Sequence, residues 1–85
     1  MGHDGYMVTV RYFAAARAAA GTEEEQAEAG TLGALLATIR QGRGERFAAV
    51  LASSSFLVDG LTCHDRDAPL PPGATVDVLP PFAGG

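Results

Sequence analysis

The chain has 85 residues, of which 47% are hydrophobic and 19% charged, so it is long enough for one folded domain and too short for two. Its formal charge is −4, with six arginines and no lysine, which argues against nucleic-acid binding because that needs clustered cations. The single cysteine, Cys63, excludes an internal disulfide and predicts a reducing, cytoplasmic location. No apolar run approaches the roughly 20 residues of a membrane-spanning helix.

The first predicted elements are a leader, a strand and a short helix. Residues 1–6 show no hydrophobic period and are predicted to be a disordered leader or tag remnant. Residues 7–13 alternate apolar and polar side chains, which predicts a strand with one buried face, although Phe13 falls on the other face. Residues 14–20 are alanine-rich and stop at Gly21, which predicts a helix of about two turns.

The middle of the chain contains one ambiguous segment and one clear helix. Residues 22–29 are undecided, because their glutamates favour a helix while their last residues alternate like a weak strand. Thr31 is a suitable N-cap for a following helix with one apolar stripe. Residues 41–46 are rich in glycine and arginine and predict a loop, and residues 47–51 predict one short apolar turn. The apolar stripe consists of Leu32, Leu35, Leu36 and Ile39.

The last third predicts a hairpin, a turn and a final strand. Residues 55–58 and 61–64 flank Asp59-Gly60, a pair that favours a type I′ turn because glycine accepts positive φ without strain. Residues 65–73 contain three prolines and predict a connecting turn, and residues 74–79 alternate again as a strand. The whole order predicts an α+β domain in which one main helix covers one face of a mixed sheet.

The six terminal residues, Pro80, Pro81, Phe82, Ala83, Gly84 and Gly85, follow a strand that does not need them. Fully extended they span about 20 Å, enough to enter the active site of another protein. Two terminal glycines leave a bare backbone that passes through a channel too narrow for a Cβ, and the terminal carboxylate is the only reactive group. Adenylation by ATP on a separate enzyme would activate that carboxylate. A frayed end or a cloning scar is the simpler alternative.

Three groups of residues together resemble a known family. The chain is similar to the ubiquitin-like β-grasp sulfur carriers of the MoaD/ThiS type, and within them to the small subunit of molybdopterin synthase. The resemblance covers residues 7–85 and implies that residues 22–29 form the second strand, that residues 7–79 form the domain and that residues 80–85 form its tail. The motifs are Val8-Thr9-Val10-Arg11-Tyr12-Phe13-Ala14 with Arg17 and Gly21, the Asp59-Gly60 hairpin, and Val78-Leu79-Pro80-Pro81-Phe82-Ala83-Gly84-Gly85.

The resemblance implies a carrier that is not an enzyme. Gly85 would be adenylated by a MoeB-type adenylyltransferase that uses ATP, and a sulfurtransferase would supply the sulfur of a thiocarboxylate. The tail, Pro80 to Gly84, would then insert into the MoaE-type large subunit, where the sulfur is transferred to the pterin precursor of the molybdenum cofactor. No cofactor or metal is expected on the carrier itself, nor a nucleic-acid or membrane partner. Carriers for cysteine or thiamin synthesis and ubiquitin-like protein modifiers are the alternatives, although a chain without lysine cannot build lysine-linked chains on itself.

Three apolar residues at strand ends, Phe13, Leu61 and Leu79, are expected to face out of the core and to converge near the tail as a partner-binding patch. The resemblance adds Arg17 to this patch. Cys63, His64 and Asp65 do not predict a metal site, because a closed zinc site needs four ligands and His3 is the only other histidine. An isolated cysteine is usually a small buried hydrophobe.

Overall fold

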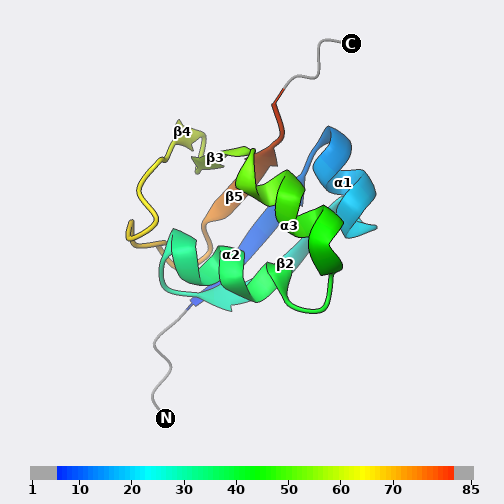
Figure 1. The fold of residues 1–85 in the computed structure, drawn as a ribbon. Helices are drawn as coiled ribbons and strands as arrows, with labels where there is room; N and C mark the ends of the chain where they lie inside the picture. Colours follow the sequence, from blue (N-terminus) through cyan, green and yellow to red (C-terminus); the bar gives the residue numbers. More distant parts are fainter. Residues whose placement is uncertain (1–5, 82–85) are drawn as a thin grey trace.

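The structure is a computed structural model that describes residues 6–81. A five-stranded sheet has the order β2-β1-β5-β3-β4, and the helices lie against it (Figure 1). Strands β1 and β5 are parallel and the other neighbouring strands are antiparallel. This architecture confirms the expected α+β, β-grasp class. The elements are β1 (Tyr6–Tyr12), α1 (Ala14–Ala20), β2 (Glu24–Ala29), α2 (Leu32–Arg40), α3 (Gly44–Ala52), β3 (Ser55–Val58), β4 (Leu61–Thr62) and β5 (Thr75–Leu79).

The two central strands build the core through their alternation. Val8, Val10 and Tyr12 of β1 are buried, while the residues between them lie on the outer face of the sheet, away from α2 and α3. Val76 and Val78 of β5 pair with Val10 and Tyr12 and have no exposed surface. The predicted alternation of apolar residues is therefore confirmed in both strands, although Asp77, on the other face of β5, is also buried at 8% exposed.

Strand β2 resolves the ambiguous segment as the family resemblance implied. It pairs antiparallel with β1, from Tyr6 opposite Ala29 to Arg11 opposite Glu24. This pairing gives Glu25 and Ala27 a partly buried position and leaves their neighbours exposed. Pairing with β1 thus overrides the helix propensity of the glutamates, because local propensity is worth less than a complete ladder of hydrogen bonds.

Helix α2 confirms the clearest prediction from the sequence. The Thr31 side chain accepts a hydrogen bond from the Ala34 backbone N–H at 3.1 Å, which satisfies one of the free donors at the helix start. The four residues of the predicted stripe are all buried against the sheet. The loop after β4 also contacts this end of the helix, since Leu32 N–H donates to the Ala68 carbonyl.

Helix α3 corrects the prediction of a loop and one apolar turn over residues 41–51. The structure has a nine-residue helix, Gly44–Ala52, in addition to α1 and the main helix α2 that the sequence predicts. Phe47 and Leu51 stand one turn apart and are 1% and 4% exposed. Gly44 has φ +84°, a left-handed conformation that turns the chain at the start of the helix. Because glycine is typical of loops, the sequence pattern predicted a loop here.

The hairpin and the proline segment are close to their predictions. Asp59 and Gly60 both have positive φ, 50° and 85°, as a type I′ turn requires. Strand β4 ends at Thr62 rather than at residue 64, because only two residues pair with β3. The connecting turn carries one isolated bridge, between Thr31 and Pro69.

The limits of the domain differ slightly from those predicted. Tyr6 belongs to β1 and pairs with Ala29, so it is not part of the leader, and β5 begins at Thr75 rather than at residue 74. Residues 1–5, including His3, lie outside the described part of the chain. Within residues 6–81 no helix is long and apolar enough to cross a membrane.

Candidate functional site

The candidate site lies where β1 and β5 end, at the base of the tail. Because these strands are parallel neighbours, their last residues meet at the same edge of the sheet. Phe13 N–H donates to the Val78 carbonyl at 3.3 Å, which places Phe13 beside the end of β5. Phe13 is 37% exposed and Leu79 is half-buried. The structure therefore brings two of the three predicted patch residues to the base of the tail.

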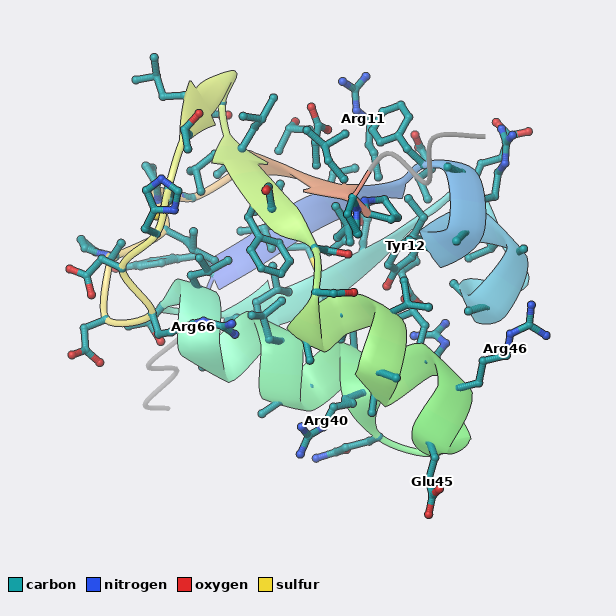
Figure 2. The ribbon with its side chains drawn as sticks, turned by 45° about the horizontal axis from the view of Figure 1, so that its top comes forward. Arg11, Tyr12, Arg40, Glu45, Arg46 and Arg66 are labelled. Carbon is teal, nitrogen blue, oxygen red and sulfur yellow. The ribbon has the colours of Figure 1, made fainter. Side chains whose placement is uncertain are left out.

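An ion pair on the outer face fixes the surroundings of the Phe13 ring. Arg11 donates two hydrogen bonds to the Asp77 carboxylate, at 2.7 and 3.1 Å, and its guanidinium lies 5.6 Å from the centre of the Phe13 ring. Figure 2 shows Arg11 on one side of the sheet and Tyr12 on the other, toward the helices. Sequence reasoning missed this pair. The alternation placed Arg11 and Asp77 on the outer face, but only the register of β1 with β5 makes them partners.

Arg17 joins Phe13 through a sharp turn of the backbone. Phe13 has extended φ and ψ, and Ala14 has φ +51°, a left-handed conformation that is costly for a residue with a Cβ. The turn starts α1, which carries Arg17. Phe13 and Arg17 line one shallow pocket of about 170 Å³ together with Arg11, Tyr12, Glu23 and Glu24. The predicted association of Phe13 with Arg17 is thus present in the structure.

Leu61 does not converge with the other two residues. It pairs with Val58, which pairs with Val76 near the beginning of β5, and so lies at the opposite end of that strand from Leu79. The separation along the sheet is about 10 Å, or three residues. The expected three-residue patch is therefore wrong for Leu61, which is 74% exposed at the hairpin. The reason is that β3 is antiparallel to β5, so its hairpin turns back beside the start of β5.

Leu57 is the apolar residue that takes the place expected of Leu61. It stands opposite Asp77 on β5, in the same row of the outer face as Arg11. The alternation of β3 contains the signal, because Phe56 is buried and Leu57 follows it on the other face. The outer face near the tail is therefore formed by Phe13, Leu57 and Leu79 around the Arg11–Asp77 ion pair.

The tail leaves the domain directly after Leu79. Pro80 is half-buried and Pro81 is exposed. Phe82, Ala83, Gly84 and Gly85 lie outside the described residues, so their predicted insertion into a channel stays a prediction. The expected role of the Gly85 carboxylate as the reacting group likewise stays a prediction.

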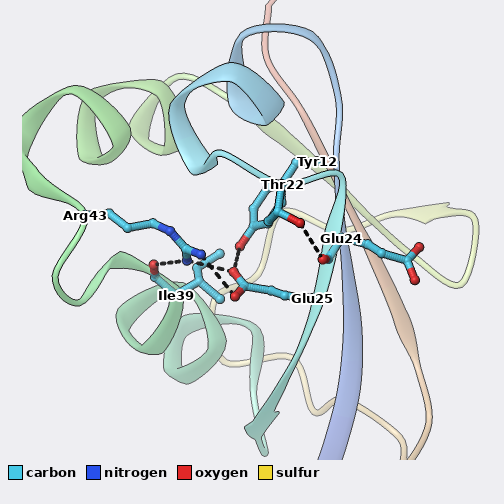
Figure 3. A network of polar contacts seen from close by, with 6 residues as sticks. All are labelled: Tyr12, Thr22, Glu24, Glu25, Ile39 and Arg43. Atoms are coloured by element: carbon cyan, nitrogen blue, oxygen red, sulfur yellow. Dashed lines mark hydrogen bonds and ion pairs between the residues drawn. The ribbon is translucent and has the colours of Figure 1, made fainter.

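A polar cluster behind the site joins the end of β1 and the start of β2 to the connection between α2 and α3 (Figure 3). The Tyr12 hydroxyl donates to Glu25 Oε2, and Arg43 donates to both oxygens of Glu25, at 2.7 and 3.0 Å. Arg43 also donates to the Ile39 carbonyl at 2.8 Å. Its guanidinium lies 5.2 Å from the centre of the Phe47 ring, which meets the Tyr12 ring edge-on. The cluster holds the strand that carries Phe13 against the helix layer.

The cluster shifts the pKa values of its members. Burial, together with the hydrogen bond to Glu25, raises the pKa of the Tyr12 hydroxyl. Burial alone would raise the pKa of Glu25, but the hydrogen bonds from Arg43 and Tyr12 outweigh it and leave that pKa below its ordinary value of 4.5. Glu25 is therefore a carboxylate at neutral pH, and its charge is matched by Arg43.

Because of Glu25, the free energy of unfolding is expected to decrease at acidic pH. Because its pKa is lower in the folded chain, its contribution is fully present above the ordinary value of 4.5 and is lost as the pH falls through the folded pKa. We expect Glu25→Gln to lower the free energy of unfolding at pH 7 by about 1.5–3 kcal/mol. Urea unfolding from pH 7 to pH 3 measures this. The difference between variant and wild type shrinks toward pH 3, and a difference that stays constant contradicts the assignment.

The loop that follows β4 contains Cys63, His64 and Asp65, for which the sequence predicts no metal site. Cys63 is half-buried and its thiol lies 3.6 Å from the Asp65 carbonyl oxygen, in the loop that follows β4. Within residues 6–81, no group of three or more His, Cys, Asp and Glu side chains is arranged to hold a metal ion. Cys63 packs as a partly buried residue against the hydrophobic core.

Comparisons with known proteins bear on the family and the fold of the chain. The sequence profile of the ThiS family matches residues 10–85, whereas no curated protein matches the chain. The putative molybdopterin converting factor subunit 1 from Pyrococcus furiosus is 30% identical with a TM-score of 0.78, covering 91% of this chain and 99% of that chain. A chain of the complex of subunits 1 and 2 of the molybdopterin-converting factor from Helicobacter pylori 26695 is 25% identical with a TM-score of 0.73, covering 93% and 99%. The small archaeal modifier protein 1 from Methanosarcina acetivorans shares the fold, with 22% identity, a TM-score of 0.83 and coverage of 99% and 100%.

Proposed function

The chain belongs to the ThiS family, and from this premise we propose that it is the sulfur-carrying small subunit of molybdopterin synthase. It is a small ubiquitin-like sulfur carrier of the ThiS/MoaD type and is not itself a catalyst. The observation that carries the finer proposal is the 30% identity to a molybdopterin converting factor subunit 1 over 91% of the chain. The second such match comes from a complex with subunit 2, which supports a MoaE-type partner.

The proposed chemistry takes place on Gly85. One oxygen of its carboxylate attacks the α-phosphorus of ATP on a MoeB-type adenylyltransferase, and pyrophosphate leaves. A hydrosulfide equivalent from a sulfurtransferase then attacks the acyl carbon, AMP leaves, and one proton is released to give the thiocarboxylate. The large subunit supplies the side chains that transfer this sulfur to the pterin precursor. The carrier contributes the reacting atom and the surface that docks it.

Intact mass measures the first half of this cycle. The full chain is incubated with ATP, sulfide and a MoeB-type adenylyltransferase, and exchange of one oxygen for sulfur adds about 16 Da. Adding the large subunit and the pterin precursor then tests the pathway. Loss of the added mass with formation of the dithiolene product supports the proposal. A thiocarboxylate that the large subunit never consumes rejects molybdopterin synthesis and leaves a carrier for cysteine or thiamin synthesis.

A ubiquitin-like modifier is the second candidate, favoured by the shared fold with the archaeal modifier protein. In that role the adenylated Gly85 would be attacked by a lysine amine of another protein, with AMP leaving and an isopeptide bond forming. The chain has no lysine, so such products contain one copy per acceptor lysine. Isopeptide adducts in the absence of any thiocarboxylate would replace the sulfur-carrier proposal with this one.

Phe13 is proposed as a docking residue for both the large subunit and the adenylyltransferase. We expect Phe13→Ala to weaken binding to the large subunit at least tenfold, because a partly exposed aromatic ring at an interface centre is a typical hot spot. Stability changes little, since the ring is 37% exposed. Titration calorimetry measures the affinity. Met7→Ala is the matched control, because Met7 is 53% exposed at the other end of β1 and should bind like wild type. Equal affinity of the two variants contradicts the role of Phe13.

A further inference from the structure

A groove of about 270 Å³ runs between α2 and α3, and sulfur transfer gives it no role. It lies in the helix layer, whereas Phe13, Arg11 and Leu79 lie at the outer face of the sheet. Small residues line the groove and keep it open. Two arginines also line it, one at the end of α2 and one in the loop after β4. The small residues are Gly33, Ala37, Ala48 and Ala52, and the arginines are Arg40 and Arg66.

The backbone of Arg66 is held firmly at the groove. Gly33 N–H donates to the Arg66 carbonyl at 2.7 Å, and a Cβ on Gly33 would lie only 3.0 Å from that oxygen. Glycine at this position therefore allows the loop to approach the helix. The Arg66 guanidinium lies 5.5 Å from the centre of the Phe56 ring. These contacts place a cation at the groove before any partner binds.

Neither arginine of the groove has an acidic partner among residues 6–81. By contrast, Arg11 and Arg43 are each paired with a carboxylate. Asp65 and Asp67 flank Arg66, but the Asp65 carboxylate accepts a hydrogen bond from the Asp67 N–H within its own loop. In a chain with a formal charge of −4, two exposed arginines on one groove that have no carboxylate partner within residues 6–81 mark a local preference for anions.

We propose that the α2–α3 groove docks an acidic, extended segment of a partner protein. Arg40 stands seven residues after Gly33, which contacts Arg66, so about 10 Å of helix separates the two ends of the groove. Figure 2 shows Arg40 and Arg66 on the helix side of the sheet, away from Arg11. In an extended peptide every second side chain lies on one face, so carboxylates at positions i and i+4 share a face and stand about 13 Å apart. The long arginine side chains span the small difference, so these two carboxylates face the two arginines, and an apolar side chain at i+2 contacts the small residues.

This docking is compatible with the use of the tail. The groove shares no residue with the pocket that contains Phe13 and Arg17. A partner on the helix layer therefore leaves the outer face and the tail free for an enzyme. The carrier then has two independent surfaces, one that presents sulfur and one that keeps it attached to an acidic protein.

The test uses the full chain labelled with nitrogen-15 and the peptide acetyl-Glu-Ala-Leu-Ala-Glu-amide, in which both glutamates and the leucine lie on one face when the peptide is extended. We expect its binding to shift the amide resonances of α2, α3 and the loop around Arg66, and to weaken with added salt. Arg40→Gln and Arg66→Gln each weaken binding at least threefold, and Ala37→Leu weakens it by filling the groove. Arg46→Gln is the matched control, because it removes the same charge from α3 outside the groove and should change affinity less than 1.5-fold.

Several results would overturn the proposal. They are shifts confined to the outer face, equal weakening by Arg46→Gln, and unchanged binding of a peptide in which both glutamates are replaced by glutamine. Shifts of the groove residues that grow with protein concentration alone, without peptide, would assign the groove to a second copy of the chain. Since Arg66→Gln also removes the contact with Phe56, its urea unfolding curve is compared with that of Arg40→Gln, which leaves that contact in place.

Discussion

Deletion of Gly84 and Gly85 is expected to abolish thiocarboxylate formation and to leave the free energy of unfolding unchanged. The truncated chain ends at Ala83, so a methyl group would stand where the proposed adenylyltransferase is expected to meet a bare backbone. All buried core residues among residues 6–81 lie at or before Val78, so the fold does not depend on the last two positions. This variant is therefore expected to lose thiocarboxylate formation and to keep the stability of the wild-type chain.

Intact mass and urea unfolding together check this expectation. The wild-type chain gains about 16 Da with ATP, sulfide and the adenylyltransferase, and the truncated chain gains nothing. Gly85→Ala is the conservative variant, which keeps the length of the tail and adds one methyl group. A truncated chain that still acquires sulfur would place the reacting group elsewhere, and Cys63 would then be the first residue to examine. Loss of stability in the truncated chain would instead show that the tail supports the domain.

Phe47→Ala is expected to cause the largest loss of stability of any single substitution described here, about 3–5 kcal/mol. Phe47 is 1% exposed, and its ring meets the Tyr12 ring edge-on at 5.7 Å between centres. It also lies under the Arg43 guanidinium, so its removal opens a cavity beside the Tyr12–Glu25–Arg43 cluster. Natural domains of this kind are stable by only about 5–15 kcal/mol, so the loss is a large fraction of the total.

Thermal unfolding measures this effect directly. For a domain of this size each kcal/mol shifts the Tm by about 4–8 °C, so the expected fall is at least 12 °C. Leu61→Ala is the control, since Leu61 is 74% exposed and its removal should cost less than about 0.5 kcal/mol. A Tm of Phe47→Ala within a few degrees of wild type would contradict the packing of α3 against the sheet.

The elements that follow from sequence are those with a strong local signal. Three such elements are the alternation of β1 and β5, the capped apolar stripe of α2 and the Asp59-Gly60 turn. Each depends only on residues that are close to one another in the sequence. The candidate reacting group also comes from sequence, because a terminal Gly-Gly carboxylate needs no structure to be recognised. Helix α3 lacked such a signal, because Gly42 and Gly44 interrupt the pattern before Phe47 begins it.

The composition and the buried faces of the central strands were thus determined by the sequence, and the chemistry of the tail is a prediction that the sequence supports. Local propensity left residues 24–29 open, and the family resemblance predicted the strand that the structure shows. Only the tertiary structure decided that Arg11 pairs with Asp77 and that Leu61 lies far from Phe13. It also decided that Arg40 and Arg66 share a groove. The physical reason is that each of these depends on register between distant segments. Strand pairing and helix packing bring together residues up to 66 positions apart, and local propensity contains no information about such contacts.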